Sequence, residues 1–581
     1  MEFQIKVREL TELLKRTGNK NEKIREAIRY KNEDSRTTLA TTVFAPGELK
    51  TLAAVIDARL AEAPTDRHNK WVKGRLRAYF ELFEGKVSSA TKVKNLQMLP
   101  IAIQRYLEES APHRWIFREN SDHILLPYLV TDIKYFKRRR ERGGYVYPAY
   151  VKIDFLGYKN GSRESESASI DEDAFTPTTV PKIFEQLGLS HETPAAVAEY
   201  TASLETYGVY QNACGVQALA IGVGFGIQLS RWQSRYSQVE MVRNGQATKV
   251  VLDPRTEELE DNKGDDEPRF YTVNFWEDVP DRNGLTARGI ELDEDEDEDE
   301  DEDDPDEPEK PKLEVMLPLH PYLYCFDLDT HSWINLHAAN LQPYDWDKTL
   351  LQKLILPQEQ KDLLQILISS SGHSIEDIVR GKMSGVIVLA TGAPGTGKTL
   401  TAEVFSEYIE KPLYNVQCSQ LGLSVDTIES NLQEILQRAS RWGAVLLIDE
   451  SDVYIRNRGE DITQNAIVGV FLRLLEYYRG VLFMTSNRGN IVDDAILSRA
   501  TAWIQYQLPS AELLATIWSV LCRQYRVELK TKEIAQLVKE LPNISGRSVR
   551  NILKLATMLK KEKATVADII NVSKYQALEQ K

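Results

Sequence analysis

The spacing of apolar residues changes twice along the chain, near residues 126 and 346. Up to about residue 125 apolar positions recur every three or four residues, as in ELTELLKR, which predicts helices. From residue 126 the period shortens toward two, as in AYVKIDFLGY, which predicts strands. We therefore expect a mainly helical domain over 1–125 and an α+β domain over 126–345.

Two smaller patterns refine this expectation. The opening MEFQIKVRELTELLKR predicts an amphipathic charged helix, and PAAVAEYTASLETYGVYQNACGVQALA predicts another helix in the middle region. The segments EMVRNGQATKVVL and LYCFDLDTHSWINLH predict hairpins, the first around an Asn-Gly turn.

Beyond residue 346 the pattern changes again. Short apolar runs such as GVIVLATG, AVLLIDE and GVLFMTS alternate with helical segments, which indicates a parallel sheet with helices on both faces. After about residue 510 only helical periodicity remains. The expected fold is therefore multi-domain, with an α/β core over 346–510 and an all-α segment over 511–581 behind the amino-terminal domains.

The net charge of −15 is concentrated in one segment. Asp293–Asp304 is a run of twelve acids, and three more acids follow within five residues. Without those fifteen, 87 − 15 = 72 acids face 72 Lys and Arg, so the remaining chain has no bulk attraction to nucleic acid or anionic lipid. Such a run buries nothing, and we expect a disordered acidic loop over 285–312. An acidic segment that docks on a basic partner is the alternative.

Cysteine usage and hydropathy point to a soluble cytoplasmic protein. The four cysteines show no metal-ligand spacing and are expected to be free thiols in a reducing compartment. No apolar run reaches membrane-spanning length, and the amino terminus lacks the features of a signal peptide. We therefore expect no membrane partner.

The chemistry begins at TGAPGTGKTL, residues 391–400, between a predicted strand and a predicted helix. The segment fills the G-x-x-x-x-G-K-[ST] template, in which glycines let backbone N–H groups surround phosphates. Lys398 is expected to reach the β- and γ-phosphates, and the Thr399 hydroxyl to hold Mg²⁺. The residues expected to contact ATP are Gly392, Ala393, Pro394, Gly395, Thr396, Gly397, Lys398, Thr399, Leu400 and Asp449.

Two carboxylates follow the next buried strand. AVLLIDE ends in Asp449 and Glu450, and its position downstream of a phosphate loop places Asp449 beside the metal with Thr399. A water that attacks the γ-phosphorus must lose a proton, so Glu450 is the candidate general base.

Two further candidate site residues, an asparagine and an arginine, lie later in the sequence. Asn487 follows the strand GVLFMTS, and its amide can orient the attacking water without repelling the γ-phosphate. Arg499, twelve residues later, can stabilise charge on the transferring phosphoryl oxygens. Taken alone, Arg499 would be read as a surface salt bridge.

Together these segments resemble the AAA+ ATPase superfamily, with TGAPGTGKTL, AVLLIDE, FMTSNR and DDAILSR matching Walker A, Walker B, sensor 1 and arginine-finger segments. In the helical tail ISGRSVRNILKLA is similar to the sensor 2 helix, with Arg547 ahead of Arg550. The resemblance covers 346–581 and implies an α/β core with a helical lid. It also implies ATP at a subunit boundary, Arg499 acting on a neighbour's nucleotide, and a homo-oligomeric ring, most often a hexamer.

A narrower likeness is to AAA-family proteins that carry RWGAVLLIDE and a long amino-terminal region of unknown role. The chain departs from ring unfoldases in the loop that usually grips polypeptide, where LGLSVDT has no aromatic residue. We expect weaker contacts there from Leu421, Leu423 and Val425. The next loop, VYIRNRGED, offers Tyr454, Arg456 and Arg458.

Three functions are compatible with these residues. The first is remodelling of a protein client that binds through residues 1–345. The second is a nucleic-acid motor or loader, because IKYFKRRRERGGYVY interleaves basic and aromatic residues, although charges also protect exposed strand edges. The third is a nucleotide-gated scaffold with slow hydrolysis. The first is our expectation.

Overall fold

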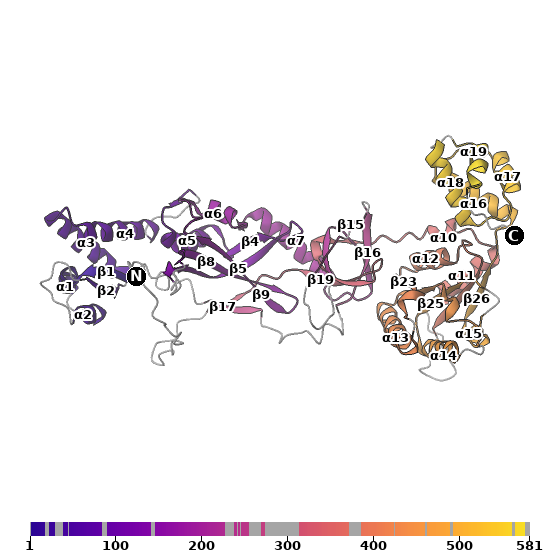
Figure 1. Cartoon of the computed structure of the whole chain (residues 1–581), viewed down its shortest axis with the longest axis horizontal. Coiled ribbons are helices and arrows are strands. Elements are labelled where there is room, and N and C mark those ends of the chain that lie inside the picture. Colours follow the sequence, from indigo (N-terminus) through magenta and orange to yellow (C-terminus); the bar gives the residue numbers. More distant parts are fainter. Residues whose placement is uncertain are drawn as a thin grey trace. The chain divides into compact units, whose positions relative to one another are not determined.

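The computed structural model of the chain divides into two compact units (Figure 1). The first comprises Met1–Gly208 and Glu258–Tyr322, and the second Val209–Glu257 and Leu323–Lys581. Residues 126–345 are therefore shared between the two units. The acidic segment 285–312 lies outside the described residues. The structure describes 2–17, 22–29, 39–44, 46–83, 90–140, 146–226, 237–240, 242–243, 246–254, 269–273, 313–370, 385–422, 424–458, 462–488, 492–560 and 564–575.

The first unit begins with a strand, not with the predicted amphipathic helix. Residues Glu2–Lys6 form β1, which pairs antiparallel with β2 (Leu39–Val43) and places Ile5 opposite Ala40. The segment EFQIK spaces its apolar residues two apart, which suits a strand, and helical spacing starts only afterwards. The helices up to residue 83 in the described part of the chain are α1 (Val7–Arg16), α2 (Glu22–Ile28), α3 (Pro46–Glu62) and α4 (Arg67–Phe83).

A five-stranded antiparallel sheet forms the centre of this unit, in the order β11–β4–β5–β8–β9. The predicted alternation in β8 is present, since Val151, Ile153 and Phe155 are buried between less buried neighbours. The strands are β4 (Trp115–Glu119), β5 (Leu125–Phe136), β8 (Tyr150–Lys159), β9 (Ser162–Asp171) and β11 (Leu189–His191).

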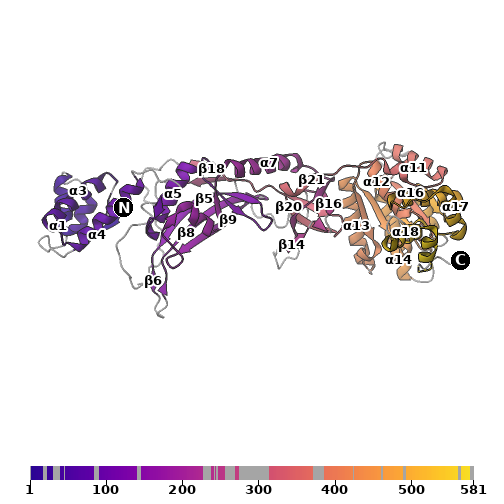
Figure 2. The same cartoon turned by 90° about the horizontal axis from the view of Figure 1, so that it is seen from above.

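Further helices and short strands accompany that sheet in the first unit. The hairpin of β6 and β7 extends away from it (Figure 2). The remaining elements are β3 (Lys92–Val93), η1 (Leu96–Met98), α5 (Leu99–Ser110), β6 (Arg139–Arg140), β7 (Val146–Tyr147), β10 (Thr178–Thr179), α6 (Val180–Gln186), α7 (Pro194–Tyr210), β17 (Phe270–Val273) and β18 (Leu313–Met316).

The second unit opens with an antiparallel sheet, which together with the residue that follows each part is here called the β-domain (residues 216–253 and 323–344). Its strand order is β14–β13–β20–β19–β16–β12–β21, and β15 also pairs with β16. The predicted helix through GVQALA is wrong beyond Tyr210, because α7 ends there and Val216–Ala220 is a strand. The strands are β12 (Val216–Ala220), β13 (Val223–Gly226), β14 (Ser237–Glu240), β15 (Val242–Arg243), β16 (Gln246–Leu252), β19 (Tyr322–Asp327), β20 (Ser332–His337) and β21 (Leu341–Pro343).

The predicted parallel sheet is present in the carboxy-terminal part, in the order β23–β24–β25–β22–β26. Its strands are β22 (Val386–Gly392), β23 (Leu413–Gln417), β24 (Val445–Asp449), β25 (Val481–Ser486) and β26 (Ala502–Tyr506). Both faces are covered: Leu446 and Ile448 pack in one apolar cluster, whereas Val445 and Leu447 pack in another. This explains why these strands read as continuous apolar runs.

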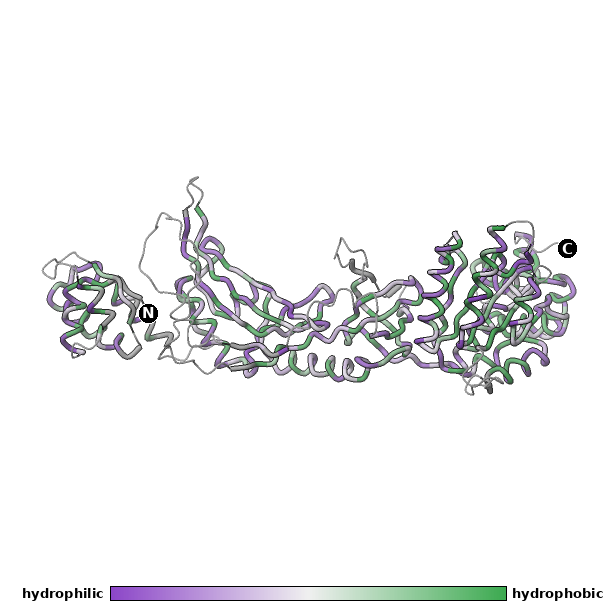
Figure 3. Tube along the Cα trace, turned by 90° about the horizontal axis from the view of Figure 1, so that it is seen from below, coloured by the Kyte–Doolittle hydropathy of each residue, from purple (hydrophilic) through white to green (hydrophobic). Residues whose placement is uncertain are grey.

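Helices cover the two faces of this sheet, and the helices that follow β26 in the sequence form a separate bundle. The helices around the sheet are α10 (Leu350–Lys353), α11 (Gln358–Ser370), α12 (Lys398–Tyr408), α13 (Val425–Trp442), α14 (Ile462–Tyr477) and α15 (Asp494–Arg499). The bundle contains α16 (Ala511–Gln524), α17 (Thr531–Glu540), α18 (Gly546–Lys560) and α19 (Val566–Ser573). It has its own core around Trp518. Hydrophobic and hydrophilic residues alternate closely along the chain (Figure 3).

The described helices include none that is both long and apolar enough to cross a bilayer.

A buried histidine ties the segment after β18 to the five-stranded sheet. His320 is fully buried, with Nδ1 2.8 Å from Glu164 Oε2 and Nε2 2.8 Å from the Pro127 carbonyl oxygen. Each ring nitrogen thus faces an acceptor, a carboxylate on one side and a carbonyl on the other. A Cβ on Gly157 would lie 2.3 Å from this ring, so glycine leaves the space for it.

This contact predicts an acid-sensitive contribution to stability. Burial alone would raise the pKa of Glu164, but the hydrogen bond from His320 and the charge of Lys159 outweigh it and hold the pKa below its usual value. A lowered folded-state pKa stabilises the fold above the unfolded-state value of about 4.3, and this contribution is lost as pH falls through the folded-state pKa. Glu164→Gln should therefore destabilise the protein by about 1–2 kcal/mol at pH 7, and by progressively less as pH falls below about 4.3.

Thermal unfolding of both proteins from pH 7 down to about pH 2.5 measures this difference. Glu172→Gln is the control, because Glu172 is half exposed and lies 3.8 Å from Arg138. A gap that is absent at pH 7, or that persists undiminished at about pH 2.5, would contradict the assignment.

Candidate nucleotide site

The phosphate loop joins the end of β22 to the start of α12 and depends on three glycines with positive φ. Gly392, Gly395 and Gly397 have φ angles of 147°, 76° and 105°, which residues with side chains rarely adopt. A Cβ on Gly392 would lie 2.1 Å from the Tyr506 carbonyl oxygen. The Thr396 hydroxyl donates to the Ala393 carbonyl at 2.8 Å and closes the turn.

Lys398 lies within this loop. Its side chain is 7% exposed, and Nζ donates to the carbonyl oxygens of Gly392 and Ala393, both at 2.8 Å. The ammonium group is therefore held against the loop whose N–H groups would surround a phosphate. The predicted contact of Lys398 with the β- and γ-phosphates stays a prediction.

Thr399, Asp449 and Thr485 form a connected group where three strands end. The Thr399 hydroxyl donates to the two carboxylate oxygens of Asp449 at 3.3 and 3.2 Å, and the Thr485 hydroxyl donates to the same carboxylate. Strands β22, β24 and β25 are parallel neighbours, so their carboxyl ends meet at one edge of the sheet. The predicted phosphate loop and the predicted carboxylates are thus brought together.

Glu450 is oriented by its backbone. Its φ is 56°, in the left-handed region, and its N–H donates to the Thr485 hydroxyl at 3.0 Å. The Cys418 thiol donates to the Glu450 carbonyl at 2.9 Å. Burial and three neighbouring carboxylates raise the pKa of Cys418 to about 12, so the thiol stays protonated as a donor. The Glu450 side chain is exposed and can therefore meet a water molecule.

Asn487 follows β25 at the same edge. Its N–H donates to Asp452 Oδ1 at 3.2 Å, and the Ser486 hydroxyl donates to the same oxygen. The Asn487 side chain is exposed, which leaves its amide available to a ligand. Asp452 and Thr485 were not predicted as site residues. Thr485 could have been found from its place two residues before Asn487 in FMTSN.

The two predicted arginines lie in different surroundings. The first turn of α18 contacts the phosphate loop, where the Arg547 N–H lies 3.3 Å from the Gly395 carbonyl oxygen and its side chain is exposed. Arg499 ends α15, with Nη1 3.3 Å from the Ala495 carbonyl oxygen and Nη2 3.6 Å from Glu476 Oε2. Among the described residues, no recorded contact joins Arg499 to the phosphate loop of its own chain.

The donor set suits a hard divalent cation. A hydroxyl and a carboxylate that already touch offer the oxygen ligands that Mg²⁺ prefers, and Mg²⁺ is commonly bound by one or two protein groups plus substrate phosphates. The described residues contain no group of three or more His, Cys, Asp or Glu that could hold a metal by themselves. Thr399 and Asp449 are therefore the residues that fit Mg²⁺ bound together with a triphosphate.

Two of the residues expected to grip polypeptide are buried. Leu421 is fully buried in the core cluster with Ile428 and Leu432, and Tyr454 is 3% exposed and donates to the Cys418 carbonyl. The expected contact of Leu421 and Tyr454 with a chain is therefore wrong, because both complete the core. Further, Val425 packs against the same cluster, Arg458 pairs with Asp493, Arg456 is exposed, and Leu423 is outside the described residues.

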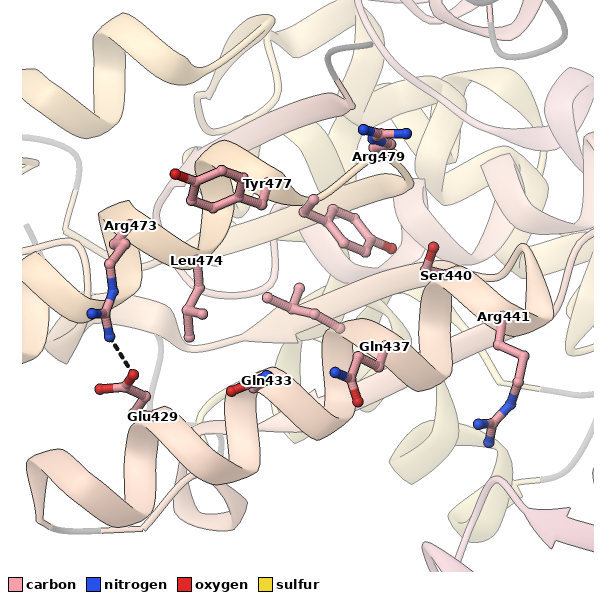
Figure 4. A pocket seen from close by; sticks show the side chains of 11 residues that line it. Glu429, Gln433, Gln437, Ser440, Arg441, Arg473, Leu474, Tyr477 and Arg479 are labelled. Atoms are coloured by element: carbon pink, nitrogen blue, oxygen red, sulfur yellow. Dashed lines mark hydrogen bonds and ion pairs between the residues drawn. The ribbon is translucent and has the colours of Figure 1, made fainter. Parts of the chain in front are cut away.

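A cavity of about 680 Å³ lies between α13 and α14, and no residue predicted to bind nucleotide is among those that line it. Figure 4 shows the Glu429–Arg473 ion pair, Gln433 and Gln437 along α13, and Arg441 near its end.

Comparison with known proteins identifies the carboxy-terminal region. Residues 388–508 match the family described as "ATPase family associated with various cellular activities (AAA)". A "Mitochondrial sorting homolog" of Caenorhabditis elegans is 27% identical over 250 residues, which cover 41% of this chain and 70% of that protein.

Two further likenesses are confined to a similar portion of the chain. An "ATP-dependent zinc metalloprotease FtsH" of Malacoplasma penetrans is 27% identical over 185 residues, 30% of this chain but only 22% of that protein. In a solved structure, the FIGL-1 AAA domain in complex with ADP is 18% identical, covers 39% of this chain and 84% of its own, and has a TM-score of 0.33.

The position of Thr485 predicts a role in turnover. Thr485→Val removes the hydroxyl that joins Asp449 to the Glu450 backbone while it keeps the side-chain shape. Loss of such an outer-shell contact should lower kcat for ATP by about 10–100-fold. Thr485→Ser, which keeps the hydroxyl, should retain most of the rate in the same steady-state assay. Equal rates for Thr485→Val and the unmodified protein would show that the contact is dispensable.

Proposed function

Because residues 388–508 of this chain form an AAA ATPase domain, we propose that the protein hydrolyses ATP with Mg²⁺ in a homo-oligomeric ring, most simply a hexamer, and uses the cycle to remodel a protein partner. The observation that carries the proposal is the hydrogen-bonded group of Thr399, Asp449, Thr485 and Glu450 beside the phosphate loop.

The site residues act in a defined order in this proposal. The loop N–H groups and Lys398 bind the phosphates of ATP, and Mg²⁺, held by Thr399 and Asp449, would neutralise charge on the β- and γ-phosphates. Glu450 accepts a proton from the attacking water, which Asn487 helps to orient. Electrostatic stabilisation of the transferring phosphoryl group then comes from preorganised donors instead of solvent.

In the proposed ring, each nucleotide site receives a further positive charge from an arginine of the neighbouring subunit. Within its own chain Arg499 contacts Ala495 of α15 and Glu476 of α14, and in the proposed ring it acts at the nucleotide of a neighbouring subunit. The backbone of Arg547 contacts Gly395, so the lid can respond to the occupancy of the phosphate loop. We assign the choice of client to residues 1–345. All four cysteines are free thiols, which suits a reducing compartment such as the cytoplasm.

Two contacts of the basic segment IKYFKRRRERGGYVY favour a protein client over nucleic acid. Phe136 stacks on Tyr150 with ring centroids 4.6 Å apart, and Arg138 lies 3.8 Å from Glu172. Phe136 and Arg138 therefore have partners within their own unit, whereas Arg142 of the same basic segment lies outside the described residues.

The assigned base predicts a variant that traps the substrate. Glu450→Gln should bind ATP with near-normal affinity but lower kcat by about 10²–10⁴-fold, because the amide cannot accept the proton. Equilibrium binding of a fluorescent ATP analogue and phosphate release, measured on the same preparation, separate the two effects. Lys398→Ala should instead lose nucleotide binding. Near-normal turnover by Glu450→Gln would refute the assignment.

Action in trans predicts complementation between two inactive variants. Arg499→Ala and Lys398→Ala should each lose most activity, because one lacks the finger and the other cannot bind ATP. Mixed rings contain some sites formed by an intact phosphate loop and an intact Arg499 from the neighbour. Activity should therefore reappear on mixing and co-assembly, and an inactive mixture in rings that demonstrably co-assemble would contradict action in trans.

A further inference from the structure

The β-domain is joined to the ATPase core through a buried charge cluster. Asp253 is fully buried and accepts hydrogen bonds from Arg441 Nε at 2.9 Å, Arg441 Nη2 at 2.6 Å and Trp442 Nε1 at 2.7 Å. Phe326 of β19 packs its ring 5.1 Å from that of Trp442 and 5.6 Å from that of Tyr414. The β-domain is thus packed on the core and is not a tethered module.

A second ion pair joins the β-domain to the far end of α12, between the buried Glu407 and Lys249, whose side chain is 44% exposed. Glu407 is 8% exposed, and its carboxylate accepts from Lys249 Nζ at 3.0 Å, from the Tyr344 hydroxyl and from the Asp347 N–H at 3.3 Å. The Lys249 ammonium also lies 4.6 Å from the centroid of the Tyr344 ring. Removal of Lys249 would leave Glu407 buried without its countercharge.

One face of α12 connects this pair to the nucleotide site. Thr399, Glu403 and Glu407 are each four residues apart, so they share that face, and Thr399 donates to Asp449. The Glu403 carboxyl group, which lies between Thr399 and Glu407 on this face, interacts electrostatically with both Lys249 and Asp449. Partial desolvation raises its pKa; the charges of Lys249 and Arg550 oppose the rise, and that of Asp449 adds to it.

The other contact leads to the same carboxylate. Arg441 and Trp442 end α13, and β24 follows directly and ends at Asp449. The β-domain therefore holds the last turn of the helix that carries Thr399 and the helix end that precedes the strand carrying Asp449. A displacement of the β-domain would change the distance between the two proposed magnesium ligands.

We infer that Lys249 is a positioning residue for ATP binding and turnover, which acts through Glu407 and α12 to hold Thr399 against Asp449. The inference rests on the proposed function, in which these two side chains bind Mg²⁺. It makes the β-domain part of the structural support of the ATPase site and gives the amino-terminal region a physical route to that site.

The test uses Lys249→Met in the full chain, which keeps the apolar stem and removes the charge. The matched control is Lys348→Met, because Lys348 pairs with Glu410, just beyond α12, at 2.8 Å while both side chains are 50% exposed or more. The measured quantities are the Mg²⁺ concentration that gives half-maximal affinity for a fluorescent ATP analogue, and kcat and KM for ATP.

Lys249→Met should raise the Mg²⁺ requirement and lower kcat, each by about 10-fold, with a smaller change in KM. Lys348→Met should stay within about twofold of the unmodified protein, because exposed pairs contribute little. Lys249→Arg should restore most of the Mg²⁺ dependence. If Lys249→Met fails to fold, Tyr344→Phe, which removes one donor to Glu407, should shift the Mg²⁺ requirement in the same direction.

Equal behaviour of Lys249→Met and Lys348→Met would overturn the inference. So would a loss of activity that follows the unfolded fraction with an unchanged Mg²⁺ requirement. Because the affinity measurement needs no hydrolysis, it tests the inference even if the unmodified protein proves inactive as an ATPase. Failure of the proposed function is then distinguishable from failure of the positioning role.

Discussion

Close backbone packing on both sides of the phosphate loop is the constraint on which the rest of the site depends. A Cβ on Gly392 would lie 2.1 Å from the Tyr506 carbonyl, and one on Gly395 would lie 2.7 Å from both Ser545 and Arg547. The loop is thus confined between the end of β26 and the first turn of α18. Its glycines allow the positive φ angles and also let the lid approach.

The parallel sheet then brings the reactive groups to that loop. Asp449 and Ser486 end neighbouring strands, so the carboxylate, Glu450 and Asn487 meet at the edge where Lys398 and Thr399 begin α12. The left-handed backbone of Glu450 is an unfavourable conformation, which the hydrogen bond to Thr485 helps to hold. The sheet supplies proximity, and the hydroxyl of Thr485 supplies orientation.

The sequence predicted those parts whose signal is local. Alternating apolar runs indicated the parallel sheet, and the motif spacing indicated the strands that end at Gly392 and Asp449. It did not predict that the β-domain packs on the carboxy-terminal core. The contact between them depends on Asp253 and Arg441, which are 188 residues apart and belong to no motif. Leu421 was misjudged for the same reason, since an apolar loop residue can face either solvent or the core.

The steady-state ATPase rate of the full chain, measured with Mg²⁺ alone, with an unfolded protein and with single- or double-stranded nucleic acid, tests the central claim most directly. The account predicts Mg²⁺-dependent turnover that a protein client increases and nucleic acid leaves unchanged. Stimulation by nucleic acid alone would contradict the proposed client. No turnover under any condition, in protein shown to be folded and assembled, would contradict the proposed activity itself.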